Sequence, residues 1–254
     1  MIFSLLHFPG TLTHQQSNDF KELYPQPLRA QVETFKLPLF PTTEPAHDEQ
    51  DIPLDDPTLA TLKRVFDVLF SASVLLFIFP VMLLVIGFLI KRDSPGPIFY
   101  RQKRTGHKNK TFSMWKFRTM RVNKLSDTVQ ATSGDSRITK IGAFLRSSSL
   151  DEFPQFINVF MGEMSVVGPR PHMVAHTTYY SSRIENYLQR HDIKPGVTGL
   201  AQIKGFRGPT EELWKMERRV DYDLQYLRDW NFFLDCKCIL KTVANVMGEE
   251  ENAL

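Results

Sequence analysis

Two adjacent carboxylates, Asp151 and Glu152, are the residues of this 254-residue chain whose types and spacing best suit phosphoryl chemistry. Ser149 and Glu152 have the spacing of a capping box, whereas Pro154 favours a helix that begins nearer Asp151. Both alternatives place the two acids in the first turn of a helix. Free N–H groups and the helix dipole favour bound anions such as phosphate there. Helix capping alone is the competing interpretation.

Adjacent helical residues point about 100° apart, so Asp151 and Glu152 should not face one another. We therefore expect separate roles for them: one carboxylate approaches a phosphorus atom, and the other holds a metal ion or a proton. Mg²⁺ suits such a site because it takes few carboxylates and completes its shell with phosphate oxygens and water. Both residues are candidate metal ligands, and Mn²⁺ is the alternative ion.

Basic side chains occur on both sides of the two acids in the sequence. Lys116, Arg118, Arg146 and Arg170 lie outside any obvious salt-bridging helix face. Arg170 stands between two prolines, which hold the backbone extended. A guanidinium fork binds two oxygens at once, and a diphosphate offers such pairs of oxygens. These four residues are predicted to bind a phosphorylated substrate, and a plain surface charge is the alternative for each.

Other polar or flexible residues are less specific. Glycines at positions 196, 199, 205 and 208 could bring a loop backbone close to a phosphate or a nucleoside, and they could equally form plain turns. His172, His176 and His191 show no metal-binding pattern with the two acids, so we interpret them as structural or solvated. Cys236 and Cys238 are interpreted as reduced packing residues.

The charge of the chain is unevenly distributed. Residues 1–58 hold nine acidic and three basic side chains, whereas residues 91–146 hold fourteen lysines and arginines against three aspartates. A basic tract of this kind favours an anionic partner. Nucleic acid is disfavoured, because the tract contains no recognition helix and no known binding motif. An anionic lipid or a phosphorylated substrate remains.

Residues 68–90 form an uncharged apolar stretch that is long enough to cross a bilayer. Pro80 stands at the middle of the stretch and predicts a break in the helix. Lys63 and Arg64 precede the stretch, and further lysines and arginines follow it. Positive flanks lie on the cytoplasmic side, so we predict a re-entrant helix-break-helix that returns to the side it entered from. A single kinked span is the alternative.

The remaining elements predict an α+β fold that is mainly helical and contains a small β-hairpin. Residues 1–58 hold eight of the sixteen prolines and are predicted to be a disordered tail, with one short helix near residues 18–22. Residues 59–92 form the membrane hairpin, and residues 93–248 form a cytosolic catalytic domain. Its predicted strands are residues 98–100, 111–118 and 165–167. Its predicted helices are residues 140–146, 153–161, 177–189, 211–228 and 230–247.

Several motifs in this order resemble the bacterial sugar transferase domain. This is the family of monotopic phosphoglycosyl transferases, also called polyprenyl glycosylphosphotransferases. The resemblance covers residues 60–248. The motifs are KRVFD at 63–67, DSPGPIFYRQ at 93–102, WKFRTM at 115–120, SLDEFPQ at 149–155, MSVVGPRP at 164–171 and KPGVTGLAQ at 194–202.

The resemblance implies transfer of a sugar-1-phosphate from a UDP-sugar to undecaprenyl phosphate at the cytoplasmic face of the bacterial inner membrane, with release of UMP. It makes Asp151 the nucleophile of a covalent phosphosugar intermediate, with Glu152 as the second member of the dyad and Mg²⁺ assisting. It matches Arg170 to the arginine of the family's Pro-Arg-Pro motif. The matching motifs also add Gln202 and Arg207 to the predicted substrate-binding residues.

Residues 170–176 and 205–226 resemble the hexose-1-phosphate branch of the family, especially undecaprenyl-phosphate glucose phosphotransferases. Glucose-1-phosphate is therefore the leading prediction, with galactose-1-phosphate or an N-acetylated sugar-1-phosphate as the alternative. The implied role is the first step of exopolysaccharide, capsule or O-antigen synthesis. A membrane scaffold without catalytic activity is a further alternative to the enzyme. A homo-oligomer is also possible from the sequence.

The sequence also departs from the family pattern at two points. Many long members carry four membrane spans and a nucleotide-binding-like domain before this region, where this chain has the proline-rich tail. Members often have Ser-Pro at the membrane kink, where this chain has Phe79-Pro80.

Overall fold

The computed structural model describes residues 52–122, 134–208 and 212–247. The tail predicted for residues 1–58, with its short helix, lies almost wholly outside these ranges. The described residues are mostly helical and contain two small sheets, which agrees with the predicted α+β class. The boundaries of the three predicted regions stay predictions.

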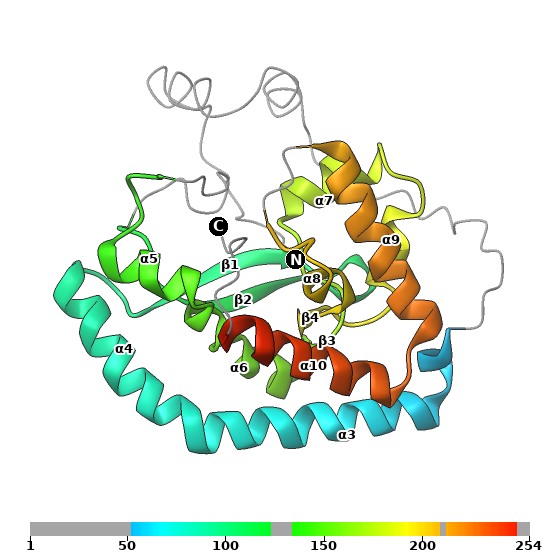
Figure 1. Cartoon of the computed structure of the whole chain (residues 1–254), viewed down its shortest axis with the longest axis horizontal. Coiled ribbons are helices and arrows are strands. Elements are labelled where there is room, and N and C mark those ends of the chain that lie inside the picture. Colours follow the sequence, from blue (N-terminus) through cyan, green and yellow to red (C-terminus); the bar gives the residue numbers. More distant parts are fainter. Residues whose placement is uncertain (1–51, 123–133, 209–211, 248–254) are drawn as a thin grey trace, which may run out of the picture. The chain divides into compact units, whose positions relative to one another are not determined.

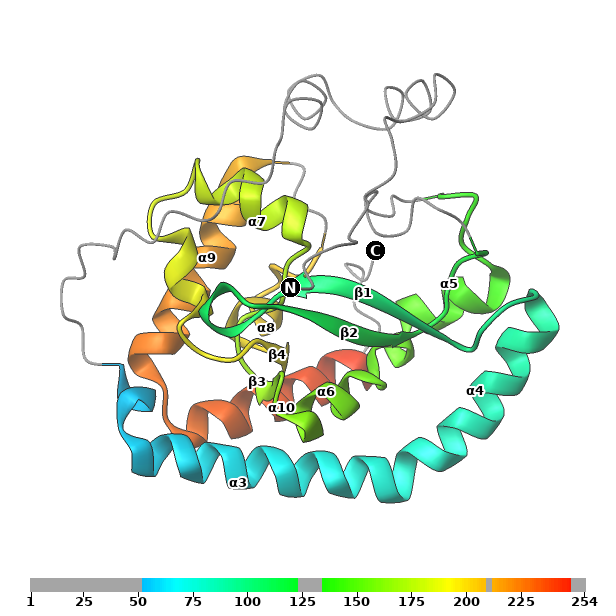
Figure 2. The same ribbon diagram turned by 180° about the vertical axis from the view of Figure 1, so that it is seen from behind.

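The predicted hairpin is present. β1 (Phe99–Thr105) pairs antiparallel with β2 (Thr111–Phe117), and Thr105 lies opposite Thr111. β1 is longer than the predicted strand at 98–100, because residues 101–105 continue the pairing with β2. Figures 1 and 2 show from opposite sides that the hairpin lies above α6 and α10.

A second sheet joins two short strands that are far apart in the sequence. β3 (Ser165–Val167) is the predicted buried strand, and it pairs in parallel with β4 (Gly196–Thr198), which was not predicted. The helix predicted over residues 177–189 is confirmed only for residues 177–181: α7 ends at Ser181, and Asn186 adopts a left-handed conformation before a separate 3₁₀ turn. The helices of the domain are α5 (Lys140–Ser147), α6 (Gln155–Met161), α7 (Val174–Ser181), α8 (Leu200–Ile203), α9 (Leu213–Asp229) and α10 (Phe232–Met247).

A long bent helix runs along the edge of the domain (Figure 1). It consists of α3 (Pro57–Ser73), a π-helical turn at Val74–Ile78 and α4 (Phe79–Asp93). Pro80 has no N–H to donate, and its ring crowds the preceding turn, so a helix bends at such a residue. The π-helical turn accommodates this local mismatch. The helix bends near Pro80 but does not break there, because the helical path continues from Pro57 to Asp93.

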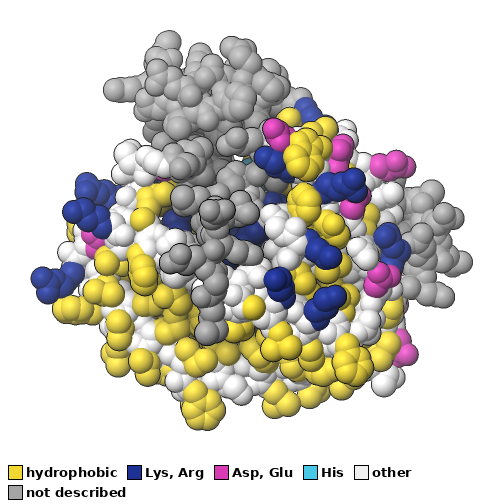
Figure 3. Space-filling view, viewed as in Figure 1, with side chains coloured by type: hydrophobic (Ala, Val, Ile, Leu, Met, Phe, Trp, Pro, Cys, Tyr) yellow, Lys and Arg dark blue, Asp and Glu magenta, His cyan; other side chains and the backbone are white. Residues whose placement is uncertain are grey.

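The side of the bent helix that faces away from the domain is apolar. The helix is long and apolar enough to cross a membrane. Figure 3 shows hydrophobic side chains gathered along the lower edge, where α3 and the adjoining part of α4 are drawn in Figure 1. A continuous exposed apolar surface of this kind is typical of a membrane contact. Its large side chains on the bent helix are Leu62, Val65, Leu69, Leu76, Phe77, Ile78, Val81, Leu84, Val85 and Phe88.

Three charged side chains of α3 attach the bent helix to the domain. Lys63 Nζ lies 2.6 Å from Asp235 Oδ2 in α10. Arg64 donates to two backbone carbonyl oxygens at the end of α6, at 2.7 and 2.8 Å. Asp67 accepts two hydrogen bonds from β3, at 2.9 and 2.8 Å. Buried charges are stable only when they are paired, so the charged motif at 63–67 is explained by this attachment.

Aromatic residues of the last two helices divide between the core and the surface. Trp230 is buried in the main hydrophobic core, which also contains residues of the hairpin, α6 and β3. Phe233 is 83% exposed and Trp214 is 52% exposed. Both cysteines are free, and Cys238 is buried, in agreement with their interpretation as packing residues.

Candidate active site

The two carboxylates lie on a 3₁₀ turn, Leu150–Glu152, that leads into α6. Ser149 precedes the turn in a left-handed conformation, with a φ angle of 60°, and its side chain forms no capping hydrogen bond in the described structure. The predicted capping box is therefore wrong. Glu152 instead reaches a group of cations, because charged donors bind a carboxylate more strongly than a single backbone N–H does.

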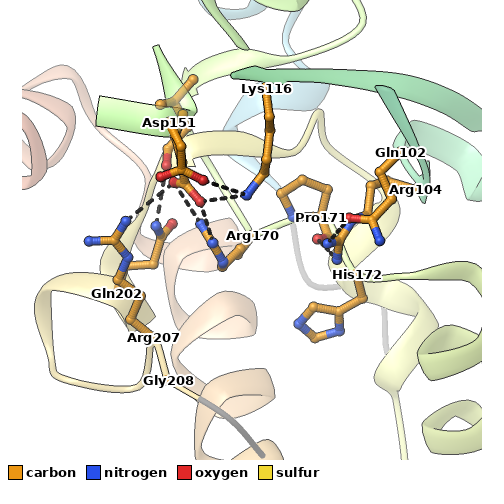
Figure 4. A network of polar contacts seen from close by, with 12 residues as sticks. Gln102, Arg104, Lys116, Asp151, Arg170, Pro171, His172, Gln202, Arg207 and Gly208 are labelled. Atoms are coloured by element: carbon orange, nitrogen blue, oxygen red, sulfur yellow. Dashed lines mark hydrogen bonds and ion pairs between the residues drawn. The ribbon is translucent and has the colours of Figure 1, made fainter. Parts of the chain in front are cut away.

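Glu152 is buried and contacts three cationic side chains, Lys116, Arg170 and Arg207, which Figure 4 shows close to Asp151. Arg170 donates from Nη2 to Oε1 at 2.6 Å and from Nη1 to Oε2 at 3.1 Å. Lys116 Nζ lies 2.9 Å from Oε1, and Arg207 Nη2 lies 3.3 Å from Oε2. Both carboxylate oxygens are therefore occupied. The structure brings together three of the predicted substrate-binding residues at this point.

Asp151 is buried beside Glu152 and has much weaker contacts. Its nearest cation is Lys116, whose Nζ lies 3.8 Å from Oδ2. Its carboxylate accepts no hydrogen bond from the residues that the structure describes. The surroundings of the two acids therefore differ: both oxygens of Glu152 are bound by cations, whereas Asp151 accepts no hydrogen bond from the described residues.

The pKa values of the two acids are shifted in opposite directions, in line with their different contacts. Burial raises the pKa of Asp151, and the nearby charge of Lys116 only partly opposes this rise. Burial also acts to raise the pKa of Glu152, but Arg170, Lys116 and Arg207 outweigh it and hold that pKa well below its usual value. Glu152 is therefore the permanently charged member of the pair.

Arg146 and Gln202 lie close to the carboxylates with unused polar atoms. The charge of Arg146 lowers the pKa of Asp151, yet its guanidinium pairs with no side chain or carbonyl in the described ranges. Gln202 donates to Val197 O at 3.2 Å, and its buried Oε1 has no partner among the described residues. Figure 4 places Gln202 in the same cluster as Asp151 and Arg207. Both side chains are available to a ligand.

Arg118 does not join this cluster, and its assignment to substrate binding is corrected. Its guanidinium donates to Pro95 O at 2.6 Å and to Ser94 O at 2.8 Å. These carbonyls belong to the turn between α4 and β1. The predicted strand at 111–118 included Arg118, but β2 ends at Phe117, so the alternation that governs Lys116 does not extend to Arg118. Arg118 therefore fastens the turn that follows the bent helix.

Two of the glycines that were considered for phosphate approach serve chain packing. A Cβ atom on Gly196 would lie 2.1 Å from Gly168 N, and one on Gly199 would lie 2.2 Å from Gly168 O. The turn that carries Arg170 consequently rests directly on β4 and the residues after it. At these two positions, therefore, glycine is needed for close backbone packing.

The oxygen donors at the site fit a single Mg²⁺ ion that is also bound by substrate phosphates. The described residues contain no group of three or more His, Cys, Asp or Glu side chains that could hold a metal alone. Asp151 has free carboxylate oxygens, and Gln202 Oε1 is a buried oxygen without a partner. Mg²⁺ accepts one or two protein ligands when phosphates and water complete its shell. The contacts of Glu152 favour Asp151 over Glu152 as the protein ligand.

A second polar network, which the sequence did not reveal, lies behind the site. It contains the buried residues His172, Arg190, Arg219 and Asp223. His172 is confirmed as structural, and burial together with the charges of Arg190 and Arg219 holds its pKa well below 6.5. Positions 219 and 223 stood in family-like stretches, but buried arginines have no local sequence signal.

Comparison with known proteins identifies the family. The sequence profile described as "Bacterial sugar transferase" matches residues 58–249. The chain is 49% identical over 217 residues to a UDP-glucose:undecaprenyl-phosphate glucose-1-phosphate transferase of Klebsiella pneumoniae, which covers 84% of this chain and 46% of that protein. Proteins of the same name from Escherichia coli K12 and Caulobacter vibrioides are 50% and 44% identical. These alignments cover 76% and 73% of this chain, and 42% and 69% of those proteins.

The chain therefore belongs to the bacterial sugar transferase family, as its motifs predicted. It spans less than half the length of the relatives from K. pneumoniae and E. coli.

Proposed function

We propose that this protein transfers glucose-1-phosphate from UDP-glucose to undecaprenyl phosphate and releases UMP. The observation that carries the proposal is the division between the two acids: Glu152 is held by three cations, and the adjacent Asp151 is buried with free oxygens. The names of the similar proteins supply the donor and the acceptor. The product would start exopolysaccharide, capsule or O-antigen synthesis.

The reaction proceeds in two displacements. An Asp151 carboxylate oxygen attacks the phosphorus that bears the sugar, the bond from this phosphorus to the bridging oxygen breaks, and UMP leaves with that oxygen. A phosphate oxygen of undecaprenyl phosphate then attacks the same phosphorus. This step breaks the bond to Asp151, forms the lipid diphosphate sugar and restores the carboxylate. Mg²⁺, when bound, would neutralise negative charge on the diphosphate of the donor.

The cationic side chains have distinct tasks in this proposal. Arg170, Lys116 and Arg207 are held by Glu152 with their positive charges beside Asp151, where the negative charge of the transferred phosphoryl group develops. Arg146 has an unpaired guanidinium and is suited to bind the donor diphosphate. Gln202 offers its free Oε1 to the metal or to a donor hydroxyl.

The experiment uses the full chain in lipid nanodiscs with radiolabelled UDP-sugars. With UDP-glucose and undecaprenyl phosphate, label should move to the lipid extract and UMP should accumulate. With UDP-glucose alone, intact mass should show one hexose phosphate added to the protein. UDP-galactose and UDP-N-acetylated sugars test the alternative donors. Absence of labelled lipid with every donor would refute transferase activity, and preference for another donor would correct the sugar.

The apolar helix is proposed to enter the membrane and return to the cytoplasmic face. The same domain holds both of its ends: Lys63 pairs with Asp235 at one end, and at the other Asp93 Oδ2 accepts from Ile141 N at 2.9 Å. A helix held at both ends by one domain has its ends on one side of the bilayer, and the positive flanks agree with a cytoplasmic location. UDP-sugars are cytosolic, so the active site belongs on that side.

Cysteine labelling tests this topology. Thr61→Cys and Pro95→Cys are each placed in a Cys236→Ser, Cys238→Ser background and treated in intact spheroplasts with a membrane-impermeant thiol reagent. Protection at both positions until the cells are lysed supports re-entry. Labelling of position 61 alone in intact cells would show a membrane span.

A further inference from the structure

Arg219 is a buried arginine whose side chain ends on a loop of the active site. It lies on α9 and is 6% exposed. Its Nε donates to Phe206 O at 2.8 Å, and its Nη2 donates to Gly208 O at 2.7 Å. These two carbonyls flank Arg207, one of the three cations on Glu152. One guanidinium therefore holds the backbone on both sides of a site residue.

The charge of Arg219 is not explained by an ion pair. No carboxylate lies within hydrogen-bonding distance of its guanidinium among the described residues, and burial, followed by the charge of Arg170, lowers its pKa to about 10. The charge of the buried Asp223 acts favourably on Arg219, but Asp223 is paired directly with Arg190. Burying a charged group without a direct ion pair is costly, and an apolar side chain would fill the space at lower cost. The two hydrogen bonds to the loop are what a guanidinium adds here.

A second buried arginine holds the other arm of the site. Arg190 Nη2 donates to Arg170 O at 2.8 Å, and its guanidinium is paired with Asp223. The His172 ring lies between the two arginines, with Nδ1 2.9 Å from Arg190 Nη1 and Nε2 3.4 Å from Arg219 Nη1. Figure 4 shows His172 on the side of Arg170 away from Arg207. The backbones of the two site arginines are thus linked through one buried network.

We propose that Arg219 is a positioning residue that acts through Arg207: it holds the loop over residues 206–208 so that Arg207 stays on Glu152. This inference rests on the proposed transfer reaction. The proposal predicts that Arg219 affects turnover only by keeping Arg207 in place. Loss of the clamp would free the loop, and displacement of a site group by about 1 Å can cost 100-fold in rate.

A double-mutant cycle tests the coupling. Arg219→Gln and Arg207→Gln should each lower kcat/KM about 10- to 100-fold, and the double variant should be no worse than Arg207→Gln alone. Arg219→Lys should recover part of the loss, since one ammonium can still donate to a loop carbonyl. Arg218→Gln is the matched control, because the Arg218 side chain is 65% exposed and pairs only loosely with Asp221, at 3.7 Å. It should behave like the wild type.

Multiplied losses in the double variant, or normal turnover in Arg219→Gln, would overturn the proposal. Should Arg219→Gln fail to fold, Arg219→Lys takes its place in the cycle. Amide hydrogen exchange provides a readout without turnover: Arg219→Gln should speed exchange in residues 204–208 and leave β1 and β2 unchanged. If the wild type transfers no sugar, the proposed function fails, and the exchange result alone decides whether Arg219 clamps the loop. Unchanged exchange would then reject it.

Discussion

Arg170 binds both oxygens of Glu152, with Nη2 2.6 Å from Oε1 and Nη1 3.1 Å from Oε2. The acid next to it in the chain, Asp151, receives no such bond from the described residues. Adjacent residues on a 3₁₀ turn point in different directions, so one backbone turn presents one acid to the cations and leaves the other available. The pairing thereby separates a permanent charge from a reactive carboxylate.

Asp151→Asn should abolish turnover and also stabilise the fold. Removal of the nucleophile should lower kcat by about 1,000-fold or more, with no phosphosugar adduct by mass. The pKa of Asp151 is raised, so the folded state favours its protonated form. The stabilisation of the folded state by protonated Asp151 is present at acid pH, and it is lost as the pH rises through the raised pKa. At neutral pH the neutral amide should therefore raise the melting temperature. A lower melting temperature would contradict this electrostatic assignment.

Glu152→Gln should destabilise the protein. Glu152 compensates three cations, and removing one partner of a buried ionic cluster costs about 3–5 kcal/mol. The pKa of Glu152 is lowered, so its stabilisation is present above the unfolded-state pKa and is lost as the pH falls through the lowered value. Chemical denaturation at pH 7 measures the change, with Glu217→Gln on the exposed face of α9 as the control. Equal stability of the two variants would show that the cluster is not held as described.

Arg146→Gln and Arg118→Gln should have opposite effects. Arg146 has no partner in the described structure, so its loss should change stability by less than about 0.5 kcal/mol and raise KM for the donor. Arg118 donates to the carbonyls of the buried Ser94 and of Pro95, so its loss should cost about 2 kcal/mol or more without a selective effect on KM. Donor titrations and denaturation curves for both variants provide the test. A selective rise in KM for Arg118→Gln would restore it as a substrate residue.

The pH dependence of turnover should report Asp151 on its acid side. The attacking carboxylate must be ionised, and burial raises its pKa above 3.8. Activity should therefore fall on acidification at a higher pH than for an ordinary aspartate. On the alkaline side, burial lowers the pKa of Lys116 below 10.5, so loss of its proton should reduce activity before that value. A flat kcat/KM profile from pH 4 upward would exclude Asp151 as the titrating nucleophile.

Chelation should remove activity. Mg²⁺ would meet Asp151, the free Gln202 Oε1 and the donor phosphates, and charge neutralisation of a leaving nucleotide is worth several kcal/mol. Dialysis against EDTA should lower turnover by about 100-fold or more, and Mg²⁺ or Mn²⁺ should restore it. Full turnover after thorough chelation would remove the metal from the proposal.

The sequence by itself determined the local features of this protein. Apolar residues 68–90 with Pro80 predicted a kinked helix, and alternation at residues 111–118 predicted one strand of the hairpin, because these patterns depend on neighbours along the chain. The motifs around Asp151 and Arg170 also identified the family. Asp151 and Glu152 are adjacent in the chain, so the sequence alone places them together without any tertiary packing.

The tertiary structure decided which cations reach Glu152. Lys116, Arg170 and Arg207 come from β2, from the turn after β3 and from the loop after α8, whereas Arg118 fastens a turn. The sequence does not distinguish these four cations, because the partner of a charged side chain depends on which distant segments fold next to it. The network of Arg190, His172 and Arg219 was hidden for the same reason. Burial makes such charges stable only in pairs or hydrogen-bonded clusters, and those partners come from distant segments that packing alone brings together.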